Sequence, residues 1–593
     1  MLAEYILTIS RYGIALLAVL IFLRCCRSLL KGKDENEIWA YLRVGDTNMP
    51  VTHWESIIGR ARSADLRIFG EGLSRLHAVL RRDDRGAWQI YDIFSGGGVW
   101  VNDTQVLDDG IRLRHGDVIN LGGSCVRFLN IDTAQRTRNE HRRTGAGKAV
   151  SPTITLCELT ALQALLALQH SFSAPREALG FMLLSFLSLV ILEWCMFEGM
   201  RLIDRNGFEV ELIAFFLTSL GLSVAISSAP ADSYKQVLLI VASVFMFLLS
   251  GWWMRSLRRT NAVRIPAGLL ALALLALNIL TSDRINGAKS WLQIGGLSMQ
   301  PSELVKVFYI YVGAATLDAL YMKRNLYAFI MYSAACVCAL AIIGDFGTAL
   351  IFFITFLVIS FMRSGSLATV LLAITGAVLA GVLALTVKPY IARRFATWGH
   401  VWEDVYAAGY QQAHAISAAA SGGLVGKGAG AGWLKNITSS ETDMVFAYVC
   451  EEQGLVVAVC MVLSIVLLAF FALKSARTGR SAFYAITACA GASMLLVQLA
   501  LNVFGSLDIL PFTGVTFPFV SRGGSSLISC WMMMAFFKGA DNRRGASFAV
   551  NPVKKIPTWE EENGIRVADE QDYYDLPAVP RKEKKHLFRR RAE

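Results

Sequence analysis

The segment GYQQAHAISAAASGGLVGKGAGAG, Gly409–Gly432, leads into SSETDMVFAYVCEEQGL, Ser439–Leu455, and the rest of the chain is organised around this pair. The first segment is rich in glycine and other small residues. The second changes from polar loop to apolar helix at Asp443. Asp is favoured at helix N-termini, so Asp443 alone predicts either a helix cap or a reactive carboxylate. At a membrane surface, beside a flexible basic loop, such a carboxylate can act as an acid or base on a lipid-linked substrate.

The composition is that of a membrane protein. Of 593 residues, 54% are hydrophobic and 17% are charged, whereas a soluble protein carries about a quarter charged residues; the mean hydropathy is +0.46. The net charge of +11 comes from Lys and Arg in short loops and in the tail, as the positive-inside rule predicts, so it does not indicate nucleic-acid binding. The eleven Cys form no CxxC pair and the eight His no HExxH motif, so neither a disulfide framework nor a zinc site is indicated.

The chain divides into regions of different composition. An apolar run, Tyr5–Leu23, followed by RCCRSLLKGK, predicts an uncleaved membrane anchor within residues 1–36 and places the next segment in the cytoplasm. Residues 37–130 alternate between apolar and polar positions with Gly and Asp turns, which predicts an all-β domain. Residues 131–152 are predicted to be a basic linker beside anionic lipid headgroups. Residues 541–593 form a polar, basic tail that we expect to be disordered at the same surface.

Apolar segments then follow in quick succession. With the anchor they predict about thirteen transmembrane helices, each near the roughly 20 residues that a bilayer requires. Residues 153–207 would form an extra hairpin, and residues 208–540 the main unit. Counting every span places the long loop Tyr390–Ser440 outside and the tail inside. The predicted fold is therefore a polytopic α-helical membrane protein with a cytoplasmic β-sandwich. The predicted spans are Thr153–Gln169, Gly180–Met200, Val210–Ser228, Gln236–Met254, Ile265–Leu280, Glu303–Leu320, Leu326–Ile343, Gly347–Met362, Leu367–Val387, Met444–Leu473, Ala482–Phe504 and Phe519–Phe537.

The β domain resembles a forkhead-associated (FHA) domain. The resemblance lies in IIGR, LSRLHAVL, SGGGVWVN and HGDVINLG. It implies that guanidinium and hydroxyl groups hold a phosphothreonine protein. The matching residues are Arg60, Ser74, Arg75 and Asn102. His77 is expected to be a packed structural histidine. Where the family usually has Asn-Gly-Thr, this chain has Gly97, Gly98 and Val99, so a degenerate docking domain is the alternative.

A second resemblance covers about Glu209–Gly539. Its motifs are NGAKSWLQIGGLSMQPSELVKVF, GDFGTAL, the Asp443 region with EEQGL, and GVTFPFVSRGGSSL. In order and wording they resemble the FtsW/RodA/SpoVE (SEDS) family, which implies a core of ten helices. The departures are modest, since Gly344, Arg522 and Gln453 stand where the family usually has Pro, Tyr and Leu.

This resemblance implies a glycosyltransferase that polymerises peptidoglycan strands from lipid II, outside the plasma membrane of a bacterium, in cell elongation, division or sporulation. The matching catalytic carboxylate is Asp443, the general base of an inverting transfer, and such a base typically contributes about 10²–10⁴-fold. Cations would meet the departing undecaprenyl pyrophosphate. The candidate substrate-binding residues are Arg394, Lys289, Lys427, Glu303, Lys306, Glu452 and Arg522. Glu303, Lys306 and Glu452 are alternatively interpreted as packing ion pairs.

The implied partners are lipid II, the growing glycan strand and a class B penicillin-binding protein that cross-links it. No cofactor is indicated with certainty. A divalent cation such as Mg²⁺, held by Asp443 and the glutamates, is left open because no spacing demands it. Two other function classes remain: a lipid II transporter, and a non-catalytic scaffold that brings phosphorylated proteins to a cell-wall complex.

Overall fold

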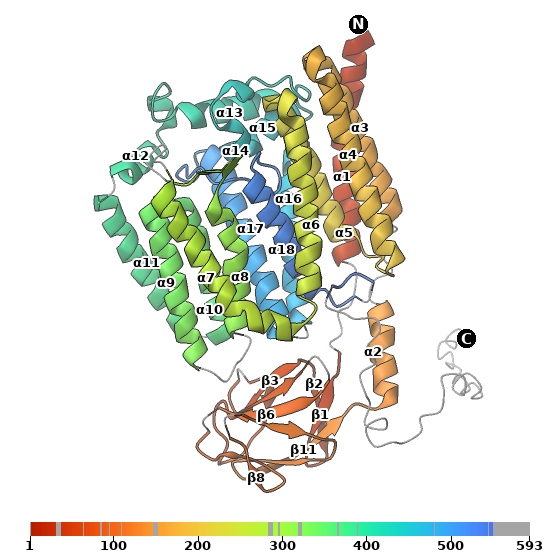
Figure 1. Ribbon diagram of the computed structural model, residues 1–593, viewed down its shortest axis with the longest axis vertical. Coiled ribbons are helices and arrows are strands. Elements are labelled where there is room, and N and C mark those ends of the chain that lie inside the picture. The colour runs from red at the N-terminus through yellow and green to blue at the C-terminus, as the bar shows by residue number, and fades with distance from the viewer. Residues whose placement is uncertain are drawn as a thin grey trace, which may run out of the picture.

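The computed structural model consists of a helical bundle with a β domain at one end, the β-domain end (Figure 1). The opposite end carries the loops and short helices between residues 389 and 455, and is called the loop end. The predicted tail beyond residue 548 and residues 146–151 of the predicted linker lie outside the described residues. The structure describes residues 2–548 except 31–36, 63, 84–85, 94, 108, 146–151, 283–288, 295–296, 318–322, 365–366, 388, 480 and 544.

The β domain is a sandwich of two sheets, with strand orders β2-β1-β11-β10-β7-β8 and β4-β3-β5-β6-β9. Alternate side chains along each strand point inward, and Trp88, Phe128 and Ile119 are among those buried between the sheets. The prediction of an all-β domain is confirmed. The strands are β1 (Ala40–Val44), β2 (Thr47–Val51), β3 (Glu55–Gly59), β4 (Leu66–Arg67), β5 (Ala78–Arg82), β6 (Trp88–Asp92), β7 (Val99–Val101), β8 (Thr104–Gln105), β9 (Ile111–Leu113), β10 (Val118–Leu121) and β11 (Ser124–Asn130).

Three accessory helices precede the main unit: α1 (Leu2–Leu30), α3 (Pro152–Ser173) and α4 (Leu179–Leu202). They pack against one another and against three helices of the main unit, α5 (Glu209–Ser228), α6 (Ser233–Trp253) and α16 (Leu455–Arg477). The β domain is inserted between α1 and α3, and an ion pair between Arg24 and Glu158, 2.9 Å apart, joins these two helices. Within the predicted linker, Thr133–Gly145 forms α2. Asp132 caps its first turn by accepting a hydrogen bond from the Gln135 N–H at 2.6 Å.

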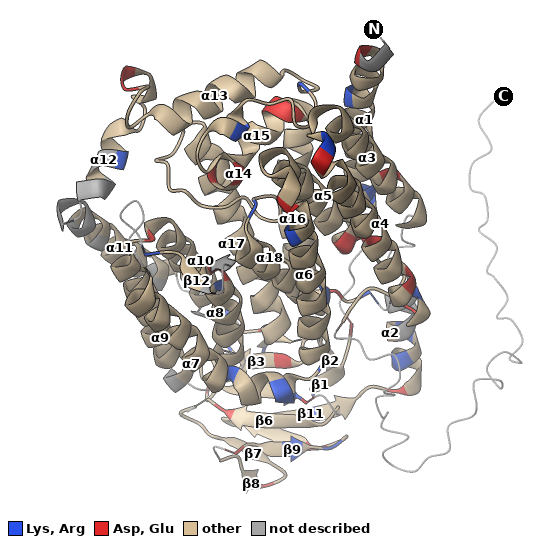
Figure 2. Ribbon diagram, turned by 45° about the horizontal axis from the view of Figure 1, so that its top comes forward, with Lys and Arg blue, Asp and Glu red and all other residues tan. Residues whose placement is uncertain are grey.

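The main unit surrounds α5 (Glu209–Ser228), which is buried along its whole membrane-length window. A helix enclosed on every side must be apolar around its circumference. Figure 2 shows that charged residues are sparse along the middle of two outer helices, α7 (Leu257–Thr281) and α9 (Lys323–Ile343). The other helices are α6 (Ser233–Trp253), α7 (Leu257–Thr281), α8 (Pro301–Leu317), α9 (Lys323–Ile343), α10 (Phe346–Ser364), α11 (Leu367–Val387), α12 (Pro389–Thr397), α13 (Tyr410–Gly422), α14 (Ser440–Asp443), α15 (Val445–Glu452), α16 (Leu455–Arg477), α17 (Ala482–Ser506) and α18 (Gly524–Ala540).

Two predicted spans are divided differently in the structure. The span Met444–Leu473 is two helices, α15 and α16, because Gly454 adopts a left-handed φ of 93°, which ends α15 as glycine commonly does. The span Phe519–Phe537 begins only at Gly524, since the preceding residues form a turn in which Phe519 has a φ of 65°. In the described part of the chain, 8 helices are long and apolar enough to cross a membrane. The total of about thirteen therefore stays a prediction.

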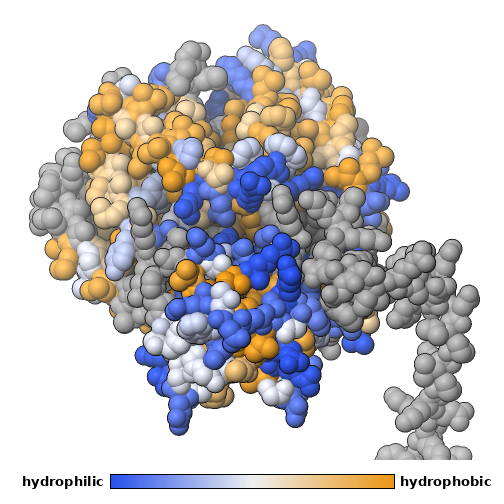
Figure 3. Space-filling view, turned by 60° about the horizontal axis from the view of Figure 1, so that its bottom comes forward, coloured by the Kyte–Doolittle hydropathy of each residue, from blue (hydrophilic) through white to orange (hydrophobic). Residues whose placement is uncertain are grey.

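The β domain contacts the bundle through the turn between β2 and β3. The His53 Nδ1 lies 3.1 Å from the carbonyl oxygen of Gly479, which belongs to the turn between α16 and α17. Figure 3, viewed from this end, shows the β domain as a mostly hydrophilic cap in front of the apolar flank of the bundle. The bundle thus has one end occupied by a soluble-type domain and one end free for the loop region.

Candidate active site

Asp443 lies at the loop end, at the junction of two short helices. It is the last residue of α14, and Met444 separates it from α15. Its backbone is fixed from outside, because the Asn502 side chain of α17 donates hydrogen bonds to the carbonyl oxygens of Asp443 (3.0 Å) and Val515 (2.8 Å). The simple helix cap expected as one alternative is therefore replaced by a braced junction that presents a half-buried carboxylate.

The surroundings of this carboxylate favour proton transfer near neutral pH. Burial raises the pKa of Asp443 to about 6, while a hydrogen bond with Thr442 and the positive charge of Arg394 act in the opposite direction. The negative charges of Glu441 and Asp345 add to the rise. A base is most effective when its pKa lies near the working pH, so Asp443 is suited to accept a proton.

Arg394 is brought to Asp443 by the segment that precedes α18. The exposed guanidinium of Arg394 donates from Nη1 to the carbonyl oxygen of Phe512 at 3.2 Å, and the backbone N–H of Gly399 binds Asp508 at 3.1 Å. A side chain at Gly514 in the same segment would stand 3.2 Å from Oδ2 of Asp443. This segment therefore holds α12 and its arginine close to the carboxylate, and the role of Arg394 in substrate binding stays a prediction.

Arg522 runs alongside α14. Its backbone N–H donates to the carbonyl oxygen of Glu441 at 2.9 Å, and the preceding Ser521 hydroxyl donates to that of Thr442 at 2.6 Å. The guanidinium, about a third exposed, stands 3.8 Å from Glu441 and 3.9 Å from Asp232. Two acidic neighbours thus compete with any anionic ligand for this guanidinium.

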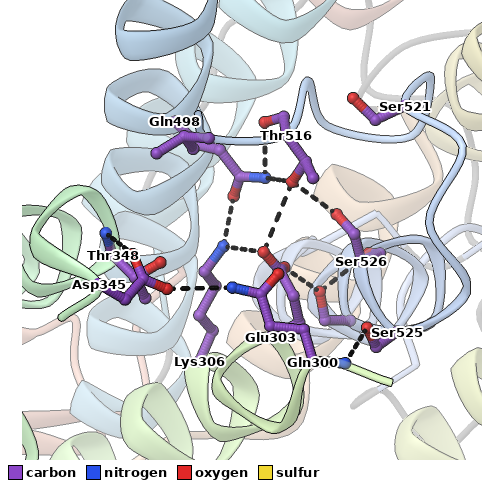
Figure 4. Close-up of polar contacts among 12 residues, drawn as sticks. Gln300, Glu303, Lys306, Asp345, Thr348, Gln498, Thr516, Ser521, Ser525 and Ser526 are labelled. Atoms are coloured by element: carbon purple, nitrogen blue, oxygen red, sulfur yellow. Dashed lines mark hydrogen bonds and ion pairs between the residues drawn. The ribbon is translucent and has the colours of Figure 1, made fainter. Parts of the chain in front are cut away.

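Lys289 lies at the loop end, but its contacts are with α7 and α9. The ammonium donates to the carbonyl oxygen of Ile279 at 2.9 Å, and the backbone N–H donates to that of Ile343 at 2.9 Å. The nearby Asp345 caps α10 by accepting from the Thr348 N–H, and it accepts a second hydrogen bond from Gln300, each at 3.0 Å (Figure 4). Lys289 therefore stabilises the turn that carries Asp345.

Glu303 and Lys306 form a buried ion pair inside the bundle (Figure 4). Their charged atoms are 2.8 Å apart, and the side chains are 3% and 0% exposed. Gln498 accepts from Lys306 at 3.0 Å and donates to the hydroxyl of Thr516 at 2.8 Å. This burial and these partners favour the alternative that Glu303 and Lys306 form a packing ion pair. A substrate would have to open the bundle to reach them.

Lys427 and Glu452 lie where the glycine-rich loop, residues 423–433, closes over the end of α15. The Lys427 ammonium is 2.8 Å from Glu451, and the backbone N–H groups of Lys427 and Gly428 donate to the carbonyl oxygens of Glu451 and Glu452 at 2.9 and 2.8 Å. The buried Glu452 carboxylate accepts from Ser227 at 2.7 Å. The structure thus places Arg394 close enough to act on the charge of Asp443 and the Arg522 backbone beside α14, whereas Lys427 is paired with Glu451 and Glu452 with Ser227.

In the β domain, Arg60, Ser74 and Arg75 lie on neighbouring segments. The N–H groups of Arg60 and Ala61 donate to the carbonyl oxygens of Ser74 and Arg75 at 3.2 and 3.0 Å, and the Ser74 hydroxyl accepts from the Gly96 N–H at 3.2 Å. These segments follow the Gly59 end of β3, whereas His53 precedes its other end. The candidate phosphopeptide loops therefore lie at the end of β3 remote from the contact with the bundle.

The side chains of His77 and Asn102 make contacts within the β domain. His77 is fully buried, accepts from the Ser74 N–H at 3.0 Å and lies 3.0 Å from the Gly98 carbonyl oxygen, so the prediction of a structural histidine is confirmed. Asn102 lies at the opposite end of β7 from Gly98. Its side chain binds Asp117 at 2.8 Å and the Val118 N–H at 2.9 Å. The structure does not bring Asn102 to Ser74.

Several residues of the loop end were absent from the sequence prediction. Asn502 and Gln498 stand inside an apolar helical run, where the sequence gives no sign of their partners. Asp345 stood within the quoted GDFGTAL motif, so a signal was present. Among the residues that the structure describes, no three His, Cys, Asp or Glu side chains gather as a metal-binding group.

The fold and the site define a polytopic membrane protein with a candidate acid–base centre at one end of its bundle and a β-sandwich at the other. Residues 210–544 match the family model of the FtsW/RodA/SpoVE cell cycle proteins, and residues 56–122 match that of the FHA domain. The chain belongs to the FtsW/RodA/SpoVE family and carries an FHA domain.

Two relatives named as peptidoglycan glycosyltransferases agree with this placement. The chain is 27% identical to the probable peptidoglycan glycosyltransferase FtsW of Buchnera aphidicola, over 54% of this chain and 83% of that protein. It is 28% identical to the peptidoglycan glycosyltransferase RodA of Mycobacterium tuberculosis, over 51% of this chain and 68% of that protein. The solved structure of Thermus thermophilus RodA is 24% identical, with a TM-score of 0.42, and covers 56% of this chain and 94% of that one.

Proposed function

We propose that this protein is a peptidoglycan glycosyltransferase that polymerises glycan strands from lipid II at the outer face of the bacterial plasma membrane. The observation that carries the proposal is the half-buried Asp443, whose pKa is raised to about 6 with Arg394 close enough to act on its charge. Two relatives named peptidoglycan glycosyltransferase support the same chemistry.

In the proposed reaction Asp443 accepts the proton of a sugar 4-hydroxyl as that oxygen bonds to the anomeric carbon of the second saccharide. The bond from this carbon to the pyrophosphate breaks, and undecaprenyl pyrophosphate leaves with the bonding electrons. Attack opposite the leaving group inverts the configuration. Arg394, whose positive charge acts on Asp443, and Arg522, beside α14, would stabilise the negative charge that develops on the pyrophosphate.

The proposed orientation places the loop end outside the cell and the β domain inside. Basic residues such as Arg255, Arg258 and Lys474 lie at the β-domain end, where the positive-inside rule favours the cytoplasm. With this orientation the FHA domain meets phosphorylated cytoplasmic proteins, and its Arg60 and Ser74 loops lie away from the bundle. A transpeptidase of the class B penicillin-binding proteins would cross-link the strands made at the loop end.

The test is polymer formation from lipid II by the purified full-length protein. Asp443→Asn keeps the size of the side chain and removes the base, so we expect a loss of about 10²–10⁴-fold in rate. Glu403→Gln, an exposed acid on the same end, is the matched control and should keep the wild-type rate. A parallel assay with EDTA asks whether a divalent cation assists Asp443 at the pyrophosphate.

Two outcomes would replace the proposal. Lipid II flipping in vesicles by a wild-type protein that forms no polymer would favour the transporter. Normal polymer formation by a folded Asp443→Asn protein would remove the assigned base.

A further inference from the structure

Both backbone polar groups of Ala429 bind the accessory helix α3. The Ala429 N–H donates to Oε1 of Gln169 at 2.8 Å, and the Ala429 carbonyl oxygen accepts from the Ser173 hydroxyl at 2.9 Å. Ala429 belongs to the glycine-rich loop, residues 423–433, whereas α3 lies before the family-matched residues 210–544. Backbone groups that leave water need partners. Here the partners come from a helix added to the family core.

The orientation of the Gln169 amide is fixed on its other side by α1. Ser10 donates its hydroxyl hydrogen to the carbonyl oxygen of Leu7 at 2.7 Å, so it can only accept from Nε2 of Gln169, which lies 2.9 Å away. Oε1 must then face the Ala429 N–H. Gln169 and Ser10 are each 2% exposed. The hydrogen bond with Ser10 of α1 therefore orients the Gln169 amide for the Ala429 N–H.

The loop held in this way forms the end of the helix that begins beside Asp443. Its Lys427 and Gly428 N–H groups bind the last carbonyl oxygens of α15, those of Glu451 and Glu452. A side chain at Gly426 would collide with the Glu452 backbone, so the loop and α15 are in direct contact. Since α15 has 8 residues, a displacement of the loop reaches Asp443 through a rigid element of about two turns.

A second route joins α3 to the same helix end. His170 of α3 lies 2.9 Å from the hydroxyl of Ser223 on α5, and the same hydroxyl accepts from Nε2 of Gln453 at 3.1 Å. Gln453 is the C-cap of α15, and it stands where the family usually has an apolar Leu. The Gln453 side chain, polar where the family usually has Leu, thus binds a hydroxyl that also contacts His170 of the accessory helix α3.

We propose that α3 is part of the catalytic unit, with Gln169 and Ser173 acting as positioning residues that hold the glycine-rich loop and, through α15, Asp443. This inference rests on the proposed function for its activity readout. The alternative is that Gln169 only joins helices, as polar side chains do inside membranes. Gln163, on the same helix, is the matched control. It is fully buried and donates to Glu193 at 2.8 Å and Ser219 at 2.9 Å, but it does not bind the loop.

The experiment compares Gln169→Ala with Gln163→Ala in the purified full-length protein, by lipid II polymerisation and by amide hydrogen exchange of residues 423–433. We expect Gln169→Ala to lower kcat by about tenfold to a hundredfold with KM nearly unchanged, because a small misplacement of reacting groups has costs of this order. Exchange in the loop should become about tenfold faster or more, since closing hydrogen bonds are lost. Gln163→Ala should lower thermal stability while kcat stays within about twofold of wild type.

A second pair of variants removes the dependence on a buried position. Ser173 is exposed, so Ser173→Ala should fold normally and still speed loop exchange. Ser173→Thr keeps the hydroxyl and should retain the protection of wild type. Equal loop exchange and equal kcat in Gln169→Ala, Ser173→Ala and wild type would overturn the positioning role. If the wild type makes no polymer, the proposed function fails, and loop exchange alone decides whether α3 positions the loop.

Discussion

The buried ion pair of α8 offers the most quantitative prediction. Lys306→Met keeps the length of the side chain and removes its charge, so Glu303 remains buried and, among the described residues, keeps the hydroxyls of Thr516 and Ser529 as hydrogen-bond donors, at 3.5 and 3.4 Å. Lys306 is 0% exposed and also loses its hydrogen bond to Gln498. Removal of one partner from a buried pair costs about 3–5 kcal/mol, a large part of the stability of most proteins.

The assay is unfolding of the detergent-purified protein followed by tryptophan fluorescence, with Lys306→Met compared to the double variant Glu303→Leu with Lys306→Met. Replacement of both charges by apolar groups of similar volume is often neutral. The double variant should therefore be more stable than the single one, although it carries more substitutions. A single variant as stable as wild type, or a double variant that is worse than the single one, would refute the assignment of a compensated buried pair.

Two further predictions concern the brace of Asp443 and the β domain. Asn502→Ala removes both hydrogen bonds that hold the Asp443 and Val515 carbonyl oxygens, and should lower the free energy of unfolding by about 1–3 kcal/mol. In a steady-state lipid II assay kcat should fall by about tenfold or more while KM changes little. An unchanged kcat would show that the brace is dispensable. Arg60→Ala should weaken binding of a phosphothreonine peptide by about tenfold or more in a fluorescence-anisotropy titration, because a charge-assisted contact is lost. Polymer formation without the peptide should stay at the wild-type rate. Equal peptide binding by both proteins would favour a degenerate docking domain.

The fold was predictable where a pattern is local. Period-two alternation predicted the β domain, and long apolar runs predicted most helices of the main unit. The helix break at Gly454 was missed because a glycine within an apolar run is also typical of a continuous helix that packs closely on its neighbours. Its left-handed φ of 93° becomes evident only from the contact with the glycine-rich loop.

The candidate site was predictable only in its reacting groups. Asp443 and Arg394 were named from motifs, and the spacing of three between Glu303 and Lys306 already allowed their ion pair, but the sequence could not say that Lys427 pairs with Glu451 or that Gln498 binds Lys306. Such pairings depend on long-range packing, as does Asn502, which lies 59 residues from the carbonyl oxygen that it binds. The role of α3 was likewise hidden, because Gln169 stood only as the last residue of the predicted span Thr153–Gln169 and nothing in the sequence indicated its partner Ala429.

The pH dependence of the polymerisation rate tests the central claim most directly. If Asp443 is the base, kcat/KM for lipid II rises with pH through a midpoint at about pH 6 and levels off at higher pH, since the carboxyl must be ionised and burial raises its pKa to about 6. Arg394 favours the ionised form, so Arg394→Met should move the acidic limb to higher pH, while Asp443→Asn abolishes it together with most of the rate. An acidic limb that persists unchanged in a folded Asp443→Asn protein would contradict the account.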